Sequence, residues 1–448
     1  MRTLVLGLLL SWLPLPSAFS QDCGGISVGR LPLSDLGFGP YQGFQGGLYP
    51  GASNERPIAH EVAGLRQVAE VLPRSASGSI DMSDGKVGFI SIGMSNCMVH
   101  FNAFMQSVAA DERKSPQLVL ANCAQSGKTA QVIMNPQAAY WTNWVPAHLA
   151  SAGLSAEQVQ VIWFLEAEAN PILPFPVDAL TLEAEFTLIM NILRDRFPNL
   201  RVCYMASRIY AGYATTTVNP EPWAYQQGFA NKWLIEDQYR GNPALNFDPN
   251  QGPVVSPWIT WGPYMWADGL NPRSDGLVWE CSDFTSDGTH PSLQGAIKHA
   301  WYLMHFMHHD VTAQSWYLAE PLPVAYGHGK TTSIGTTPKV SWTGPASLAA
   351  DQFRVELEGG VPGRVVIGLW SDKAASAPFL GGTLYLGAPI HRLPGQVLDA
   401  NGSTSYAIQL VPPLLGATRN YQFWFRDPQQ LDGTGAGLSD ALQVRFFE

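Results

Sequence analysis

Three side chains in the sequence could together carry out nucleophilic catalysis: Ser95, Asp287 and His290. Ser95 follows the apolar run 87–93 and opens a helical pattern, so its hydroxyl and amide would lie at a helix N-terminus, where negative charge is stabilised. Asp287 and His290 stand three residues apart in one tight turn, where the carboxylate can orient the imidazole. The other ring nitrogen could then take the proton of the serine hydroxyl. Taken separately, Ser95 could simply cap a helix, and Asp287 could simply shape an Asp-Gly turn beside an incidental histidine.

The elements that must position these side chains lie between about residues 86 and 310. Apolar runs predict strands at 87–93, 117–121, 159–165, 200–205 and 257–261, and helical spacing predicts helices at 96–110, 136–153, 180–197, 222–239 and 292–309. Continuous apolar strands that alternate with helices predict a parallel sheet covered on both faces. The expected fold class is α/β, a flavodoxin-like three-layer α/β/α domain with about five parallel strands. Such sheets gather their chemistry beyond the carboxyl ends of the strands, which would bring the serine and the Asp-x-x-His turn together.

The chain has 448 residues, enough for two domains or three. Residues 21–84 are rich in Gly and Pro and predict a loop-rich lead-in, with short helical patterns at 57–72. The α/β domain is expected at 85–317. From there on the helical signal disappears, and strand-like runs alternate with turns, which predicts a linker at 318–338 and an all-β sandwich module at 339–448.

Composition excludes two broad classes of protein. Hydrophobic residues make up 46% of the chain and charged residues 14%, so intrinsic disorder is excluded as its main state. Lys and Arg number 26 against 36 Asp and Glu, which gives a net charge of −10, and no basic run occurs. Nucleic acid is therefore not an expected partner, because phosphate binding needs clustered positive charge.

The first 20 residues have the pattern of a secretory signal peptide. Arg2 gives a positive start, an apolar stretch follows at 4–13, and Ala18-Phe19-Ser20 supplies small residues before a cleavage site at Gln21. A membrane anchor is the alternative, but the stretch is shorter than the roughly 20 residues of a spanning helix, and no later segment is long and apolar enough. We expect a secreted or periplasmic protein with no integral membrane segment once the signal peptide, 1–20, is removed.

No metal site is expected from the cysteines or histidines. None of the five cysteines is spaced as CxxC, and their odd number leaves at least one thiol unpaired; the others could be buried thiols or form one or two disulfides: Cys23, Cys97, Cys123, Cys203 and Cys281. His305, His308 and His309 lie near the end of one predicted helix, where cations suit the helix dipole, so we expect solvated or capping histidines there.

The combination of a serine after the first strand and Asp-x-x-His before the last helix resembles the SGNH hydrolases, also called GDSL-type esterases. The segment 92–96, Ile-Gly-Met-Ser-Asn, is similar to the Gly-x-Ser-Asn form of the carbohydrate acetylesterase branch, and Asp287 and His290 match the last block of the family. The resemblance covers about residues 85–310. It implies a serine esterase that hydrolyses short-chain, acetyl esters on carbohydrate or another small ester, with Ser95 as nucleophile and with no cofactor and no metal.

The same resemblance implies an oxyanion hole. It would be formed by the amide of Ser95, by Gly127 after the second strand and by an asparagine side chain after the third strand. Gly127 could also be an ordinary turn glycine. The third block departs from the family's Gly-x-Asn, and either Asn170 or Glu168 could occupy its position; we expect Asn170, because an ionised carboxylate would repel an oxyanion.

Four further residues are expected at the mouth of the site as substrate contacts: Arg208, Trp261, Tyr264 and Trp279. Arg208 follows the fourth strand, the next two follow or end the fifth, and Trp279 precedes the Asp-x-x-His turn. Aromatic rings at such a rim could stack on sugar rings. Each of them taken singly could instead be packing or core.

Two other functions fit part of the pattern. An α/β-hydrolase-type lipase or esterase also has Gly-x-Ser on a strand–helix turn and the order Ser, Asp, His, but Cys97 stands where its second glycine is expected. A non-catalytic carbohydrate-binding or adhesion protein could keep the fold and an aromatic rim while carrying a dead third block. Turnover of a simple acetyl ester separates an enzyme from a binder.

Overall fold

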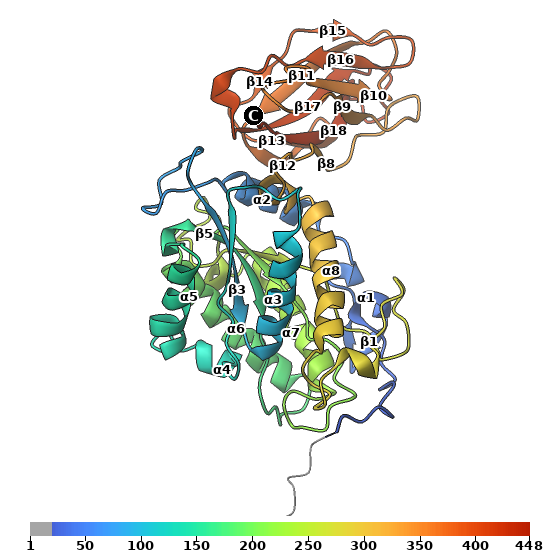
Figure 1. Ribbon diagram of the computed structural model, residues 1–448. Coiled ribbons are helices and arrows are strands. Elements are labelled where there is room, and N and C mark those ends of the chain that lie inside the picture. Colours follow the sequence, from blue (N-terminus) through green and yellow to red (C-terminus); the bar gives the residue numbers. More distant parts are fainter. Residues whose placement is uncertain (1–19) are drawn as a thin grey trace, which may run out of the picture.

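The computed structural model describes residues 20–448, so the predicted signal peptide lies, except for Ser20, outside the described residues. The first large unit holds a five-stranded parallel sheet with the order β4-β3-β5-β6-β7 (Figure 1). Its strands are β3 (Val87–Gly93), β4 (Leu118–Asn122), β5 (Val159–Leu165), β6 (Val202–Met205) and β7 (Trp258–Trp261). This order is second, first, third, fourth, fifth along the chain, the flavodoxin-like arrangement, so the predicted fold class is confirmed.

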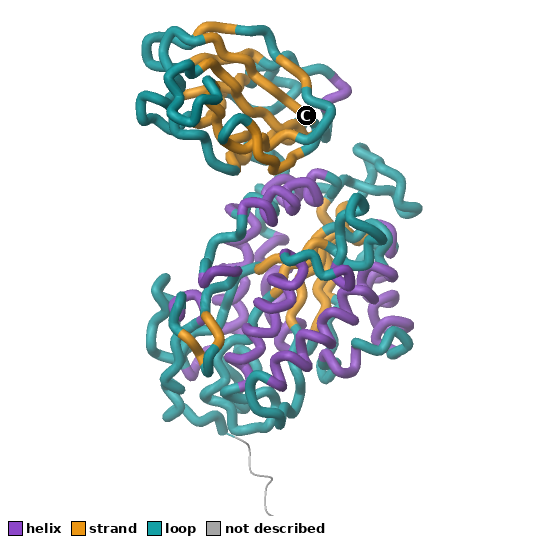
Figure 2. Tube along the Cα trace, turned by 180° about the vertical axis from the view of Figure 1, so that it is seen from behind, coloured by secondary structure: helices purple, strands orange, loops and turns teal. Residues whose placement is uncertain are grey.

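Helices cover both faces of the parallel sheet (Figures 1 and 2). The long helices are α3 (Ser95–Ala109), α6 (Val177–Arg196), α7 (Trp223–Tyr239) and α8 (Leu293–His309), and the shorter ones are α4 (Ala130–Ile133), α5 (Val145–Ser151) and α9 (Gln314–Tyr317). Helices α3 and α8 share one apolar cluster with the sheet, and α6 and α7 share the other. The helix expected at 136–153 is interrupted, because a π-helical turn at Tyr140–Trp144 precedes α5.

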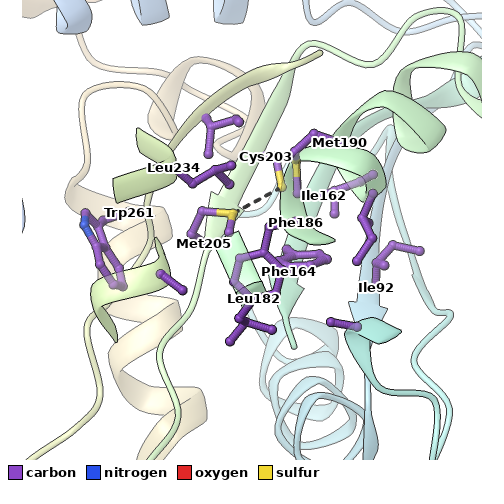
Figure 3. Packing of buried hydrophobic residues seen from close by; sticks show 14 of the residues in the cluster. Ile92, Ile162, Phe164, Leu182, Phe186, Met190, Cys203, Met205, Leu234 and Trp261 are labelled. Carbon is purple, nitrogen blue, oxygen red and sulfur yellow. Dashed lines mark hydrogen bonds between the residues drawn. The ribbon is translucent and has the colours of Figure 1, made fainter. Parts of the chain in front are cut away.

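The strands are mostly apolar because helices cover both faces of the sheet. In β5, Phe164 packs edge-on against Phe186 of α6, with ring centroids 5.2 Å apart, within the cluster drawn in Figure 3. The preceding side chain, Trp163, points to the opposite face and stacks on Phe101 of α3, with centroids 5.8 Å apart. Successive side chains of a strand alternate between faces, so a doubly covered strand is apolar along nearly all of its length.

The N-terminal lead-in wraps around the β7 edge of the sheet. It contains α1 (Leu33–Leu36), the hairpin β1 (Pro40–Tyr41) and β2 (Phe44–Gln45), a 3₁₀ turn (Pro50–Ala52) and α2 (Ile58–Ala69). Tyr49 Oη lies 2.8 Å from Thr260 Oγ1, and His60 Nε2 lies 2.9 Å from the carbonyl oxygen of Ile259. The lead-in is therefore built into the α/β domain and covers part of its surface.

One disulfide fastens the start of the described chain to a distant segment. Cys23 and Cys281, 258 residues apart in sequence, are bonded, with Cα atoms 5.4 Å apart. Cys97, Cys123 and Cys203 are buried free thiols. Both outcomes that the sequence left open therefore occur, with one disulfide and three buried thiols.

The C-terminal region is all antiparallel β-structure in two main sheets. The larger sheet contains β8 (Val324–Tyr326), β11 (Val365–Ser371), β14 (His391–Arg392), β15 (Gln396–Val397), β17 (Thr418–Arg426) and β18 (Ala436–Arg445); the smaller contains β9 (Lys339–Thr343), β10 (Arg354–Glu358) and β16 (Thr404–Ala407); β12 (Ala374–Phe379) and β13 (Gly382–Leu386) form a hairpin. An apolar cluster with side chains from both sheets fills the module. Strand β8, which pairs with β18, falls within the segment 318–338 that we predicted as a linker.

The β-rich module packs against the end of the α/β domain where the parallel strands begin. Helix α2 lies under β12 (Figure 1), and Gln443 Nε2 donates to the carbonyl oxygen of Leu65 at 3.4 Å. One apolar cluster runs across the junction and includes Leu65, Trp316 and Tyr326. Within residues 20–448, no helix combines the length and the apolar character that crossing a bilayer requires.

Three buried neutral histidines predict a weakness in acid. Burial lowers the pKa of His299 to about 3 and that of His60 to about 4, and it holds the pKa of His100 well below 6.5. Such a group binds a proton in the unfolded chain but not in the folded protein. The free energy of unfolding therefore has its full value above about pH 6.5 and decreases as the pH falls. We expect wild type to lose roughly 1.4 kcal/mol per pH unit relative to His299→Phe between about pH 6 and 4, measured by urea unfolding.

The comparison with a variant is necessary because buried carboxyl groups act in the opposite direction. Burial raises the pKa of Glu185 to about 9, for example, which favours the fold as the pH falls. These groups are common to both proteins and cancel in the difference. The phenylalanine keeps an aromatic ring against His100, whose ring centroid lies 4.0 Å from that of His299. A difference that does not change with pH would contradict the assignment of His299 as a buried neutral base.

Candidate active site

The structure brings Ser95, His290 and Asp287 into one hydrogen-bonded line. Ser95 Oγ lies 2.8 Å from His290 Nε2, and His290 Nδ1 lies 2.6 Å from Asp287 Oδ2. The serine is half-buried, and the side chains of His290 and Asp287 are 31% and 28% exposed, so small molecules can reach the line from solvent. The three residues come from two places 195 residues apart in the sequence.

Asp287 is fixed as an ionised carboxylate. Besides the imidazole, it accepts hydrogen bonds from Thr285 Oγ1 at 2.8 Å, Thr289 N at 2.9 Å and His290 N at 3.0 Å. Burial alone would raise the pKa of Asp287, but the hydrogen bonds outweigh burial and lower it to about 2. The carboxylate therefore favours the tautomer of His290 that carries the proton on Nδ1, and this tautomer leaves Nε2 free to accept the serine proton.

Two glycines allow the line to form. A Cβ at Gly93, the last residue of β3, would lie 2.2 Å from the carbonyl oxygen of Leu165, so only glycine lets β3 end this close to β5 before Ser95. Gly288, next to Asp287, has φ +66°, and a Cβ there would lie 1.9 Å from the carbonyl oxygen of Tyr213. Glycine is the residue that fits both the left-handed conformation and the close approach.

The loop after β6 holds the Asp-x-x-His turn against α3. Thr215 N donates to the carbonyl oxygen of Asp287 at 3.3 Å, and Thr216 Oγ1 lies 3.2 Å from Thr289 Oγ1. On the other side, Asn96 Nδ2 donates to the carbonyl oxygen of Thr289 at 3.2 Å. Asn96, the residue after Ser95, thus ties the helix that carries Ser95 to the turn that carries His290.

The two residues expected in the oxyanion hole with Ser95 lie on loops at the same edge of the sheet. Gly127 has φ +72° in an exposed turn, and this turn is tied to the end of β3 because Gln125 N donates to the carbonyl oxygen of Gly93 at 2.9 Å. Asn170 is exposed, and its Oδ1 accepts a hydrogen bond from Thr217 Oγ1 at 2.8 Å. This bond fixes the orientation of the amide and leaves Nδ2 as the group that can donate.

Glu168, the alternative at this position, is engaged elsewhere. Burial, the contact with Glu168 and the charge of that neighbour together raise the pKa of Glu185 on α6 to about 9. Glu168 therefore lies against a second carboxyl group that is protonated at neutral pH. The exposed amide of Asn170, oriented by Thr217, is the better candidate for the third donor.

Arg208 is buried beside the site instead of lining an open mouth. Its Nε donates to Asn219 Oδ1 at 3.0 Å, and its two terminal nitrogens find no hydrogen-bond partner among the described residues. Burial lowers the pKa of Arg208 to about 10, against the opposing effect of the Glu221 and Asp287 carboxylates. The guanidinium remains charged at neutral pH, so its charge acts on Asp287 through the interior.

The three aromatic residues expected at the rim are buried, so they do not form an exposed stacking surface. Trp261 Nε1 donates to the carbonyl oxygen of Leu48 at 2.7 Å, and Tyr264 Oη accepts from Leu33 N at 3.2 Å. Both partners belong to the N-terminal lead-in, which covers this part of the sheet edge; Figure 3 places Trp261 among apolar core side chains. Trp279 is completely buried.

Sequence reasoning missed the threonines that support the site: Thr285, Thr289, Thr216 and Thr217. They are hydroxyl-bearing residues within a few positions of the triad or in the run 215–217. Only the run of three threonines at 215–217 stands out in the sequence, and its role becomes clear only once the position of the loop after β6 is known. Across the described part of the chain, no three His, Cys, Asp or Glu side chains gather closely enough to hold a metal ion.

Comparisons with known proteins identify no relative. No protein family and no curated protein matches the sequence. Among solved structures, the periplasmic domain of a Salmonella ser. Paratyphi A lipopolysaccharide acetyltransferase is 12% identical, with a TM-score of 0.28, over 55% of this chain and 93% of that chain. A GH3 β-glucosidase from Bifidobacterium adolescentis is 11% identical, with a TM-score of 0.14, over 86% of this chain and 54% of that chain. Similarities this low carry no argument, so the site rests on its own geometry.

The orientation of Asn170 predicts which side chain completes the site. Asn170→Ala is expected to lower kcat by roughly 10²–10³-fold with a smaller effect on KM, because a lost oxyanion donor acts on the transition state. Steady-state kinetics on a soluble acetyl ester measure both constants. Glu168→Gln is the comparison, and it should retain most of the turnover. The reverse pattern, with Glu168→Gln inactive and Asn170→Ala active, would assign the third position to residue 168.

Proposed function

We propose that this protein is a serine ester hydrolase in which Ser95 attacks the ester carbonyl. The observation that carries the proposal is the unbroken line of hydrogen bonds from Ser95 through His290 to Asp287, at 2.8 and 2.6 Å. A serine hydroxyl is a weak nucleophile by itself. An imidazole aligned with it, and oriented by an ionised carboxylate, is the arrangement that activates it.

The chemistry would follow two similar steps. His290 Nε2 takes the Ser95 proton as Oγ bonds to the carbonyl carbon, and the resulting oxyanion is stabilised by Ser95 N, Gly127 N and Asn170 Nδ2. His290 returns the proton to the leaving alcohol oxygen as the carbon–oxygen bond breaks, which leaves an acylated serine. A water molecule then attacks the acyl carbon while its proton passes to His290. Ser95 leaves with that proton, and the carboxylic acid is released.

The substrate we infer is a short-chain ester, above all an acetyl ester on a carbohydrate. Support comes from the resemblance of segment 92–96 to the Gly-x-Ser-Asn form of SGNH carbohydrate acetylesterases and from the signal-peptide pattern at 1–20, which predicts export. Arg208 is buried, so we expect it to act on this site through its charge and not by contact with the substrate. No cofactor enters this scheme.

Two observations favour this function over its alternatives. The acid and the histidine share one turn, as in the SGNH pattern, whereas an α/β-hydrolase usually supplies them from separate loops. The alternative of a carbohydrate-binding protein depended on an exposed aromatic rim, but Trp261, Tyr264 and Trp279 are at most 5% exposed. An intact triad also has no role in a simple binder.

The test is the loss of the nucleophile. Ser95→Ala should lower kcat on p-nitrophenyl acetate by roughly 10⁴-fold or more, because no other group of the site can form the acyl-enzyme. The melting temperature should stay close to that of wild type, since the hydroxyl is half-buried. Ser107→Ala, at the other end of the same helix, is the matched control and should be fully active. Near-wild-type activity of Ser95→Ala would refute the proposed function.

The hydrogen-bonded line also predicts how the triad residues combine. His290→Ala and Asp287→Asn should each lower kcat strongly, and the double variant should be little worse than His290→Ala alone, because Asp287 acts only through the imidazole. The three variants are compared with wild type on one ester. A double variant that shows the full product of the two losses would mean that Asp287 does not act through His290.

A further inference from the structure

Large apolar side chains stand exposed around the mouth of the candidate active site. Ile172 is 85% exposed, Leu293 70%, Leu173 40% and Val218 36%. We call these four residues the apolar collar. A single exposed leucine is ordinary, but several exposed aliphatic side chains on segments that neighbour one site are a feature that marks an interaction surface.

Hydrogen bonds place the collar next to the catalytic line. Ile172 follows the candidate donor Asn170 by two residues, and Asn170 accepts from Thr217, the neighbour of Val218. Leu293 follows His290 by three residues at the start of α8. The loop of Val218 is also tied to the catalytic turn, since Thr216 Oγ1 lies 3.2 Å from Thr289 Oγ1. Three adjacent segments therefore carry both the site and the collar.

The loop that carries Ile172 and Leu173 is held in place while its tip is displayed. Its sequence from 170 to 176 is Asn-Pro-Ile-Leu-Pro-Phe-Pro, and three prolines restrict its backbone. Phe175 anchors the loop in the core against Phe44, with ring centroids 5.2 Å apart. Trp223 Nε1 donates to the carbonyl oxygen of Leu173 at 2.9 Å. The fold therefore holds Ile172 in its exposed position. Because the loop is already ordered, it loses little conformational entropy when a partner covers Ile172.

The chemistry of the collar limits what can cover it. No charged residue occurs at 169–177 or at 209–220, and Leu293 lies between the uncharged Ser292 and Gln294. On the segment of Leu293, Asp287 is paired with His290 and Lys298 with Asp283, so the collar offers no free charge to an acidic or basic partner. Aliphatic side chains have no flat ring face for stacking on a sugar and cannot pair with its hydroxyl groups. A side chain that is 85% exposed protrudes instead of lining a pocket, so it must enter its partner. The partner that fits the collar is therefore an uncharged, apolar surface that deforms around a protruding side chain.

We propose that the apolar collar docks on a neutral lipid surface, so that an ester presented at a lipid–water interface is hydrolysed faster than the same ester in solution. The proposal rests on the proposed ester hydrolysis only for its second part, because docking by itself needs no catalysis. Burial of aliphatic side chains in the acyl region would hold the carboxyl edge of the sheet, and with it Ser95, at the interface. The acyl group can still be short, since the collar contacts the surface around the ester.

The first experiment measures docking without turnover. Full-length Ser95→Ala is sedimented with phosphatidylcholine vesicles over a range of lipid concentrations. Binding is expected, with little dependence on salt, because no charge takes part. Adding Ile172→Ser or Leu293→Ser should weaken binding about tenfold each. Leu431→Ser is the matched control, because Leu431 is 98% exposed in the β-rich module, and it should bind as tightly as the parent.

The second experiment measures the consequence for catalysis. Wild type is assayed on tributyrin below and above its solubility limit, and the rate should rise steeply once droplets form. In Ile172→Ser and Leu293→Ser, the ratio of the droplet rate to the dissolved-ester rate should fall, while Leu431→Ser should keep the wild-type ratio. If Ser95→Ala hydrolyses esters but vesicle binding depends on the collar, the proposed function fails and the docking stands.

Three results would overturn the docking proposal. The first is the absence of vesicle binding, or binding that Leu431→Ser weakens as much as Ile172→Ser does. The second is a dimer in light scattering that Ile172→Ser dissociates, which would make the collar an interface between two copies of the chain. The third is binding to an acetylated polysaccharide, and not to vesicles, that is lost in Ile172→Ser.

Discussion

The hydrogen bond between Asp287 and His290 is the interaction on which the candidate site depends. Its two partners lie three residues apart, so the turn itself sets their geometry. The rest of the domain has only to deliver this turn to Ser95. The sheet supplies the serine at the end of β3, Asn96 ties the serine helix to the turn, and the loop after β6 braces the turn from the other side. The disulfide between Cys23 and Cys281 fixes the segment that precedes the Asp287–His290 turn.

Much of this arrangement could be predicted from the sequence, because it depends on local pattern. The strands β3 and β5 begin and end at the predicted residues, 87–93 and 159–165, since a doubly covered parallel strand is a nearly continuous apolar run. The parallel sheet then requires its carboxyl ends to meet at one edge. The pairing of Ser95 with His290 follows from that topology, although 195 residues separate them.

The parts that could not be predicted depend on contacts between distant and irregular segments. The lead-in has weak periodicity, so nothing in it indicated that Leu33 and Leu48 would cover Tyr264 and Trp261. Spacing alone likewise left Glu168 and Asn170 as alternatives. The choice between them rests on Glu185, which α6 places against Glu168, and on Thr217, which the next loop places against Asn170. Residue types with several uses, such as threonine in turns, acquire a role only from their neighbours in space.

The position of the β-rich module determines how far its outer face lies from Ser95. The module packs where the strands begin, near Lys86 and Val87, whereas Ser95 lies where β3 ends. Helix α8 has 17 residues and runs from the Asp287–His290 turn to the junction, a length of about 25 Å. Anything held by the outer face of the module is therefore separated from the serine by the thickness of a whole domain. The outer face of the module and Ser95 therefore lie at opposite ends of the chain, so a molecule bound at one end would not cover the other.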